Sequence, residues 1–143
     1  MTTLSLNKRI AFAVLGLLLL AVNPCFALRS IGYILQKEAK EMGLEVRANG
    51  SGPDQVWVEL EFKAEGKLKD FHHAELEIQE GEKVLIAYAA LRETRPRPGH
   101  IVIRFLTDRS YLHKISVQLV LGEIGDQGWI VRVKDFVEAD KPR

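Results

Sequence analysis

The chain has 143 residues, of which 47% are hydrophobic and 27% charged, and its 20 Lys and Arg side chains nearly balance 19 Asp and Glu. A nucleic-acid-binding domain would carry a basic excess on one face, so this balance argues against a nucleic-acid partner. The single cysteine excludes an intrachain disulfide, and the length fits one globular domain.

The first 27 residues have the three-part order of a secretory signal peptide. Lys8 and Arg9 precede an uncharged apolar run over residues 10–22, and the small residues Cys25 and Ala27 occupy the positions that a signal peptidase recognises. The apolar run is shorter than the ~20 residues that cross a bilayer. We therefore expect cleavage after Ala27 and no permanent membrane span.

Cleavage would leave residues 28–143, which carry 18 basic and 19 acidic side chains and no cysteine. A domain of this size can be held together by its core alone, without metal, cofactor or disulfide. The sequence thus predicts a secreted or periplasmic protein of the cell envelope. Its expected parts are a signal peptide at 1–27, an N-terminal edge segment with a short helix at 28–43, and a β-sandwich domain at 44–143.

The N-terminal edge segment combines a strand pattern with a helix pattern. Residues 28–35 favour an edge strand, because they include β-branched and aromatic side chains. Residues 36–42 favour a short helix that Gly43 ends at the C′ position. A single helix that begins at Ser30, a good N-cap residue, is the alternative.

Alternation of apolar and polar residues predicts most of the later strands. The side chains expected to point inward are Val56, Val58, Leu60 and Phe62, then His72, Ala74, Leu76 and Ile78, then Ile101, Ile103 and Phe105, then Tyr111, His113, Ile115, Val117, Leu119 and Leu121, and finally Trp129, Val131 and Val133. Gln118 falls on the opposite, solvent-facing side. Residues 84–91 are apolar on both faces, so a helix is possible there, but the tight turn before them favours a strand.

Short strands separated by turn residues are typical of an all-β sandwich or barrel. Their order over residues 44–137 resembles the immunoglobulin or fibronectin type III sandwich, a likeness of architecture only. We predict an antiparallel β-sandwich of about seven strands, preceded by one short helix.

Metal binding is not favoured by the spacing of the candidate ligands. His72 and His73 are adjacent in a predicted strand and would face opposite sides. His73, Glu75 and Glu77 share a face, but their tips would recur about every 7 Å, whereas zinc ligands all lie about 2 Å from the ion. We expect the glutamates to pair instead with basic residues on neighbouring strands: Glu75 and Glu77 with Lys114, Arg132 and Lys134, and Glu59 and Glu61 with Arg104.

Catalysis is also not favoured. The four serines that would follow the cleavage site lie outside any Gly-x-Ser-x-Gly elbow. Ser110 and His113 are close in sequence, but both fall at a predicted corner, where a turn-capping role suffices.

Two features could bind a partner. Trp57 shares its face with glutamates and could offer an exposed indole for stacking on a sugar, unless residues 28–35 cover it. Arg92, Arg95 and Arg97, with His100, could meet an anionic surface, unless they are only solvated. The sequence therefore predicts a non-catalytic exported module with a binding or structural role in the cell envelope, and an envelope protein or a glycan is the partner it suggests. A small envelope hydrolase or metal-binding protein is the alternative.

Overall fold

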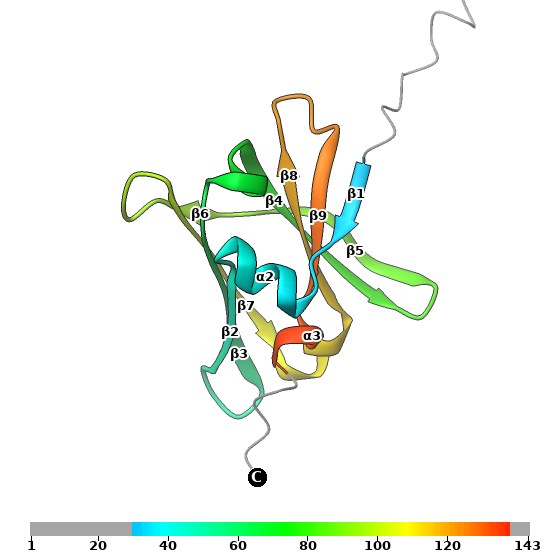
Figure 1. Cartoon of the computed structure of the whole chain (residues 1–143). Coiled ribbons are helices and arrows are strands. Elements are labelled where there is room, and N and C mark those ends of the chain that lie inside the picture. Colours follow the sequence, from blue (N-terminus) through cyan, green and yellow to red (C-terminus); the bar gives the residue numbers. More distant parts are fainter. Residues whose placement is uncertain (1–29, 138–143) are drawn as a thin grey trace, which may run out of the picture.

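The computed structural model describes residues 30–137 (Figure 1), in which two β-sheets face each other. The order of the five-stranded sheet is β1 (Ser30–Tyr33), β9 (Gln127–Arg132), β8 (Ile115–Leu121), β4 (Phe71–Glu80) and β5 (Lys83–Leu91). The order of the four-stranded sheet is β2 (Glu45–Gly50), β3 (Gln55–Lys63), β7 (His100–Asp108) and β6 (Glu93–Thr94). The prediction of an all-β sandwich is confirmed at this level.

The strand count and pairing differ in detail from the prediction. Residues 30–137 contain nine strands rather than about seven: the edge strand predicted within residues 28–35 is present as β1, and the two-residue β6 was not predicted. β1 lies parallel to β9, whereas all other pairs are antiparallel. The predicted signal peptide and its cleavage site lie outside the described residues.

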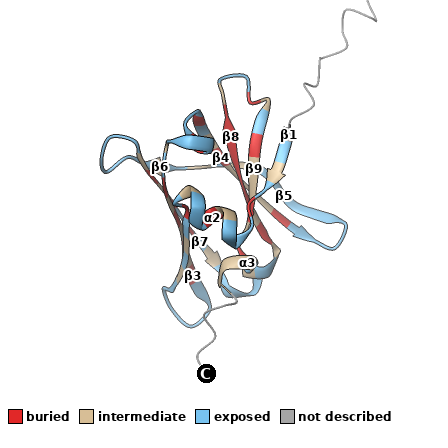
Figure 2. Ribbon diagram, viewed as in Figure 1, coloured by how far each residue is buried: buried red, intermediate tan, exposed pale blue. Residues whose placement is uncertain are grey.

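The core lies between the sheets, where Figure 2 shows the buried residues. Its inward side chains include most of those expected from alternation: Val58, Leu60, Phe62, Ala74, Ile78, Ile101, Ile103, Phe105, Ile115, Val117, Leu119, Leu121, Val131 and Val133. Phe62 meets Phe71 edge to face, with 5.1 Å between ring centroids. Such aromatic pairs contribute about 0.5–1.5 kcal/mol beyond their buried area.

Helix α2 (Gln36–Met42) crosses from β1, at the edge of one sheet, to β2, at the edge of the other. The buried side chains of Ile34, Ala39 and Leu44 tie this crossing to the core. Gly43 takes the left-handed conformation with φ of 65°, and the Leu44 N–H donates to the Ala39 carbonyl at 2.8 Å. The predicted short helix and its glycine stop are confirmed, and the single helix from Ser30 is not formed.

A bulge in β4 changes which side chains point inward. Phe71 pairs with Leu121 and His73 with Val120, so His72 is an extra residue on β4. An extra residue reverses the alternation at that point. Phe71 is therefore buried and His72 exposed, and the inward orientation predicted for His72 is wrong.

The segment before β8 also differs from the prediction. Residues 109–114 form the 3-10 helix η2 (Arg109–Lys114), so Tyr111 and His113 do not continue the strand. β8 is buried on both faces, and Gln118, predicted to face solvent, is only 8% exposed. Residues 84–91 belong to strand β5, as expected, but most of their side chains are exposed. Two short helical elements complete the fold: η1 (Gly66–Leu68) and α3 (Lys134–Val137).

Candidate functional site

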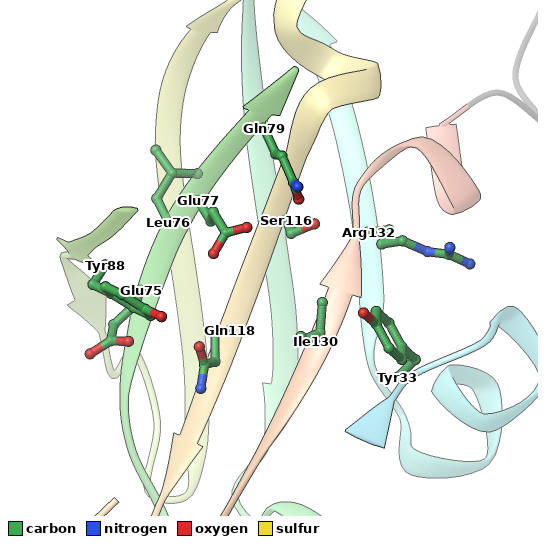
Figure 3. Close-up of a pocket in the computed structure, with 10 residues that line it drawn as sticks. All are labelled: Tyr33, Glu75, Leu76, Glu77, Gln79, Tyr88, Ser116, Gln118, Ile130 and Arg132. Atoms are coloured by element: carbon green, nitrogen blue, oxygen red, sulfur yellow. The ribbon is translucent and has the colours of Figure 1, made fainter. Parts of the chain in front are cut away.

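A groove of about 260 Å³ lies on the outer face of the five-stranded sheet (Figure 3). All five strands of that sheet contribute to it. Its lining residues are Tyr33 from β1, Glu75, Leu76, Glu77 and Gln79 from β4, Tyr88 from β5, Ser116 and Gln118 from β8, and Ile130 and Arg132 from β9.

The strand register places the lining residues in rows across the sheet. Glu75 pairs with Gln118, Gln118 with Ile130, and Ile130 with Tyr33. With neighbouring strands about 4.8 Å apart, this row spans about 14 Å. A second row, one step along the strands, contains Glu77, Ser116 and Arg132. The groove floor is therefore polar, and a tyrosine stands at each side of it.

Gln118 is the buried polar group of this floor. Its Nε2 has no hydrogen-bond partner within residues 30–137, although the side chain is 8% exposed. Gly128, on the adjacent strand, leaves room for the amide, because a Cβ there would lie 3.3 Å from Nε2 and 3.2 Å from the Leu119 carbonyl oxygen. An unpaired buried donor costs about 1–3 kcal/mol, so this arrangement favours an acceptor supplied from outside the chain.

Tyr88 reaches the groove from a strained backbone position. Among residues 30–137 it is the single non-glycine residue with positive φ, at 54°. Between the pairs Leu76–Ala89 and Ile78–Ile86, β5 has two residues where β4 has one, so Tyr88 lies in a bulge with one extra residue. A left-handed conformation costs about 1–2 kcal/mol for a residue with a Cβ, and such strain is concentrated at binding sites. The Tyr88 side chain is 64% exposed.

The charges of the groove are unevenly compensated. The Arg132 Nε lies 2.7 Å from Asp135 Oδ2, and its guanidinium lies 5.4 Å from the centre of the Tyr33 ring. The Glu75 Oε1 lies 2.9 Å from the Nε2 of His73. Glu77 is half-buried and has no ion pair within the described part of the chain. The groove therefore carries net negative charge.

The candidate metal ligands are placed differently from the expectation. The Nδ1 atoms of His72 and His73 lie 2.8 Å apart, because the bulge lets both rings reach the same region. The expectation that these adjacent residues face apart is wrong. His73 contacts Glu75, and Glu77 lines the groove, but within residues 30–137 no three His, Cys, Asp or Glu side chains gather as a metal site would require.

The outer face of the four-stranded sheet carries Trp57 in a network of charges. The half-buried Trp57 lies under the Arg104 guanidinium, which is 5.3 Å from its ring centre. Arg104 also lies 3.3 Å from Glu59, so the predicted pairing of these two residues is confirmed. The idea that residues 28–35 cover Trp57 is wrong, because the strand β1 in this segment belongs to the other sheet.

Arg47 extends this network of charges. Its guanidinium lies 3.5 Å from Glu59 and 3.4 Å from Glu61, and it also bonds Glu45. The hydrogen bond and charge of Glu45 raise the pKa of Arg47 above its usual value. The glutamates on this face thus form ion pairs with arginines of the same chain, as the sequence indicated for Glu59.

The loop arginines and the serine candidate are exposed. Arg95 pairs with Glu93 at 2.7 Å, while Arg92 and Arg97 form no ion pair among residues 30–137. Ser110 and His113 both lie in η2 and are exposed, and no hydrogen bond joins them in the described structure. Neither set of residues lines the groove.

Most groove residues were missed as site residues at the sequence level, among them Tyr33, Tyr88 and Gln118. A signal for Gln118 is present in the sequence, because the same face of that strand carries Val120, an apolar neighbour that indicates partial cover. No local pattern indicates Tyr88, since its orientation follows from the bulge in β5.

No family model, no curated protein and no solved structure matches the chain. The helices of residues 30–137 include none that is both long enough and apolar enough to cross a membrane. Function is therefore inferred from the groove.

Proposed function

We propose that the chain is an exported, non-catalytic binding module of the cell envelope, whose groove on the five-stranded sheet holds a sugar unit of a glycan. The observation that carries this proposal is the buried, unpartnered amide of Gln118 on the groove floor. A sugar hydroxyl both accepts and donates hydrogen bonds. Because Nε2 itself is buried beside Gly128, the Gln118 amide turns toward the groove when a sugar hydroxyl accepts from it and donates to the carboxylate of Glu75, the residue paired with Gln118 across the sheet.

The walls and size of the groove support a sugar as the ligand. Tyr33 and Tyr88 are 56% and 64% exposed, so each offers an aromatic ring with a polar tip. The volume of about 260 Å³ is slightly below the range of about 300–1,000 Å³ that is typical of drug-sized ligands. One sugar ring, with the rest of the glycan outside, suits this space.

A binding role is favoured over glycoside hydrolysis by the placement of the two groove carboxylates. Glu75 and Glu77 are two residues apart on one strand and point from the same face of the sheet. Glycosidases place their two carboxyl groups on either side of the scissile bond. A ligand lying on this sheet would meet both glutamates from the same side.

Two further assignments belong to this proposal. The sandwich is taken to be of the immunoglobulin type, because the orders β2-β3-β7-β6 and β5-β4-β8-β9 correspond to the A-B-E-D and C′-C-F-G orders of that fold. Export rests on the charge and apolar pattern of residues 1–27. N-terminal sequencing of exported protein should find Leu28 first, and a chain that still begins at Met1 would contradict processing.

The test of binding is calorimetric titration of the purified full chain with neutral and charged oligosaccharides. Gln118→Met and Tyr88→Ala should each weaken binding about tenfold or more, because one removes a buried donor and the other a stacking ring. Trp57→Ala is the matched control on the opposite sheet and should bind as the wild type does. Loss of binding in Trp57→Ala alone would move the site to the other face. Release of shortened sugars would support a hydrolase instead.

A further inference from the structure

The charges that face the groove distinguish between classes of sugar. They belong to Glu75, Glu77 and Arg132. Arg132 is held by Asp135 at 2.7 Å and stacks on Tyr33 at the far side of the groove. Lys114 pairs with Glu80 and does not line the groove. A ligand in the groove would therefore meet two carboxylates and one guanidinium that already pairs with Asp135.

The two glutamates differ in how they are compensated. Glu75 has a partner within the chain, because its Oε1 lies 2.9 Å from the Nε2 of His73. Glu77 is half-buried and opposite Ser116, with no cationic partner within residues 30–137. A partly desolvated carboxylate without a counter-charge is costly, and a hydrogen bond from a cation is roughly twice as strong as one from a neutral donor.

We propose that the groove selects a sugar unit that carries a protonated amine, with its ammonium group at Glu77 and its hydroxyls at Gln118. This inference rests on the proposed function, because it concerns the same groove. The exposed Tyr88 ring adds a surface on which a cation is attracted. An acidic sugar would face Glu75 and Glu77 and would have to compete with Asp135 for Arg132.

The experiment compares oligosaccharides of glucosamine, N-acetylglucosamine, glucose and glucuronic acid by calorimetric titration of the full chain at low salt. The glucosamine oligomer should bind about tenfold or more tightly than the neutral oligomers, and the glucuronic acid oligomer most weakly. Glu77→Gln should remove this preference, so that the glucosamine oligomer binds that variant no more tightly than the glucose oligomer does. Glu41→Gln, on the exposed side of α2, is the matched control and should retain the preference.

The outcomes separate this inference from the proposed function. Equal binding of the glucosamine and glucose oligomers, lost in Gln118→Met, would overturn the amine selection and keep the sugar site. Absence of binding by all four oligomers would overturn both. A trilysine peptide supplies ammonium groups without sugar hydroxyls, and we expect it to bind much more weakly than the glucosamine oligomer. Binding of trilysine in place of every sugar would overturn the glycan assignment.

Discussion

Replacement of Gln118 by Met should stabilise the unliganded protein. The Gln118 Nε2 is buried without a partner, and the cost of such a group is about 1–3 kcal/mol. Methionine has a similar length and no polar donor, and a near-isosteric exchange in a packed site costs less than about 1.5 kcal/mol. We therefore expect the free energy of unfolding to rise by about 1 kcal/mol, which corresponds to a Tm increase of roughly 4 °C for a domain of this size.

Urea unfolding at equilibrium, with the midpoint and the slope fitted for each variant, measures this effect. Gln79→Met is the control, because Gln79 is an exposed glutamine on the same side of the sheet, and its change should stay within about 0.5 kcal/mol. If Gln118→Met were less stable than the wild type by about 1 kcal/mol or more, the Gln118 amide would have to form a hydrogen bond in the folded, unliganded protein. That result would remove the reason for expecting a ligand to bond to this amide.

Three further changes test the fold. Phe105→Ala should lower the free energy of unfolding by about 3–5 kcal/mol, because Phe105 is a buried core residue; a loss below about 1 kcal/mol in urea unfolding would contradict the core assignment. Gly32→Ala should cost about 1–3 kcal/mol, because its Cβ would lie 2.6 Å from the facing tryptophan ring, whereas Gly52→Ala, in open space, should change little in the same assay. The hydrogen bond and charge of Lys114 lower the pKa of Glu80 below its usual 4.5. The pair therefore stabilises the fold fully above pH 4.5, and this stabilisation is lost as the pH falls through the lowered pKa of Glu80. In thermal melts, the gap between wild type and Lys114→Met should therefore narrow in acid, and a gap that widens would refute the pairing.

Much of the fold follows from patterns local to the sequence. Side chains of β3 and β7 alternate between the core and the outer face, and in each strand a one-residue shift would move the core side chains to the outer face. The burial of Val58, Leu60 and Ile103 was therefore predictable. Gly43 likewise ends α2 for a local reason, because glycine adopts a positive φ at little cost.

The site was less predictable, because it depends on contacts between distant residues. Gln118 alternates as a solvent-facing residue should, but the space beside it is set by Gly128 on another strand. Tyr88 faces the groove because β5 bulges against β4, and an apolar run such as residues 84–91 does not reveal a bulge. The sequence drew attention to Trp57 because its neighbours are charged, yet those same charges pair with one another in the structure.

Chemical-shift mapping by NMR tests most directly the claim that the outer groove of the five-stranded sheet is the binding site. The full chain labelled with ¹⁵N would be titrated with a glucosamine oligosaccharide. We predict that the largest changes fall on the side-chain amide of Gln118 and on the backbone amides of Tyr33, Glu77 and Tyr88. Changes confined to the surroundings of Trp57 or to the loop that contains Arg95 and Arg97, or no change at saturating sugar, would contradict the account.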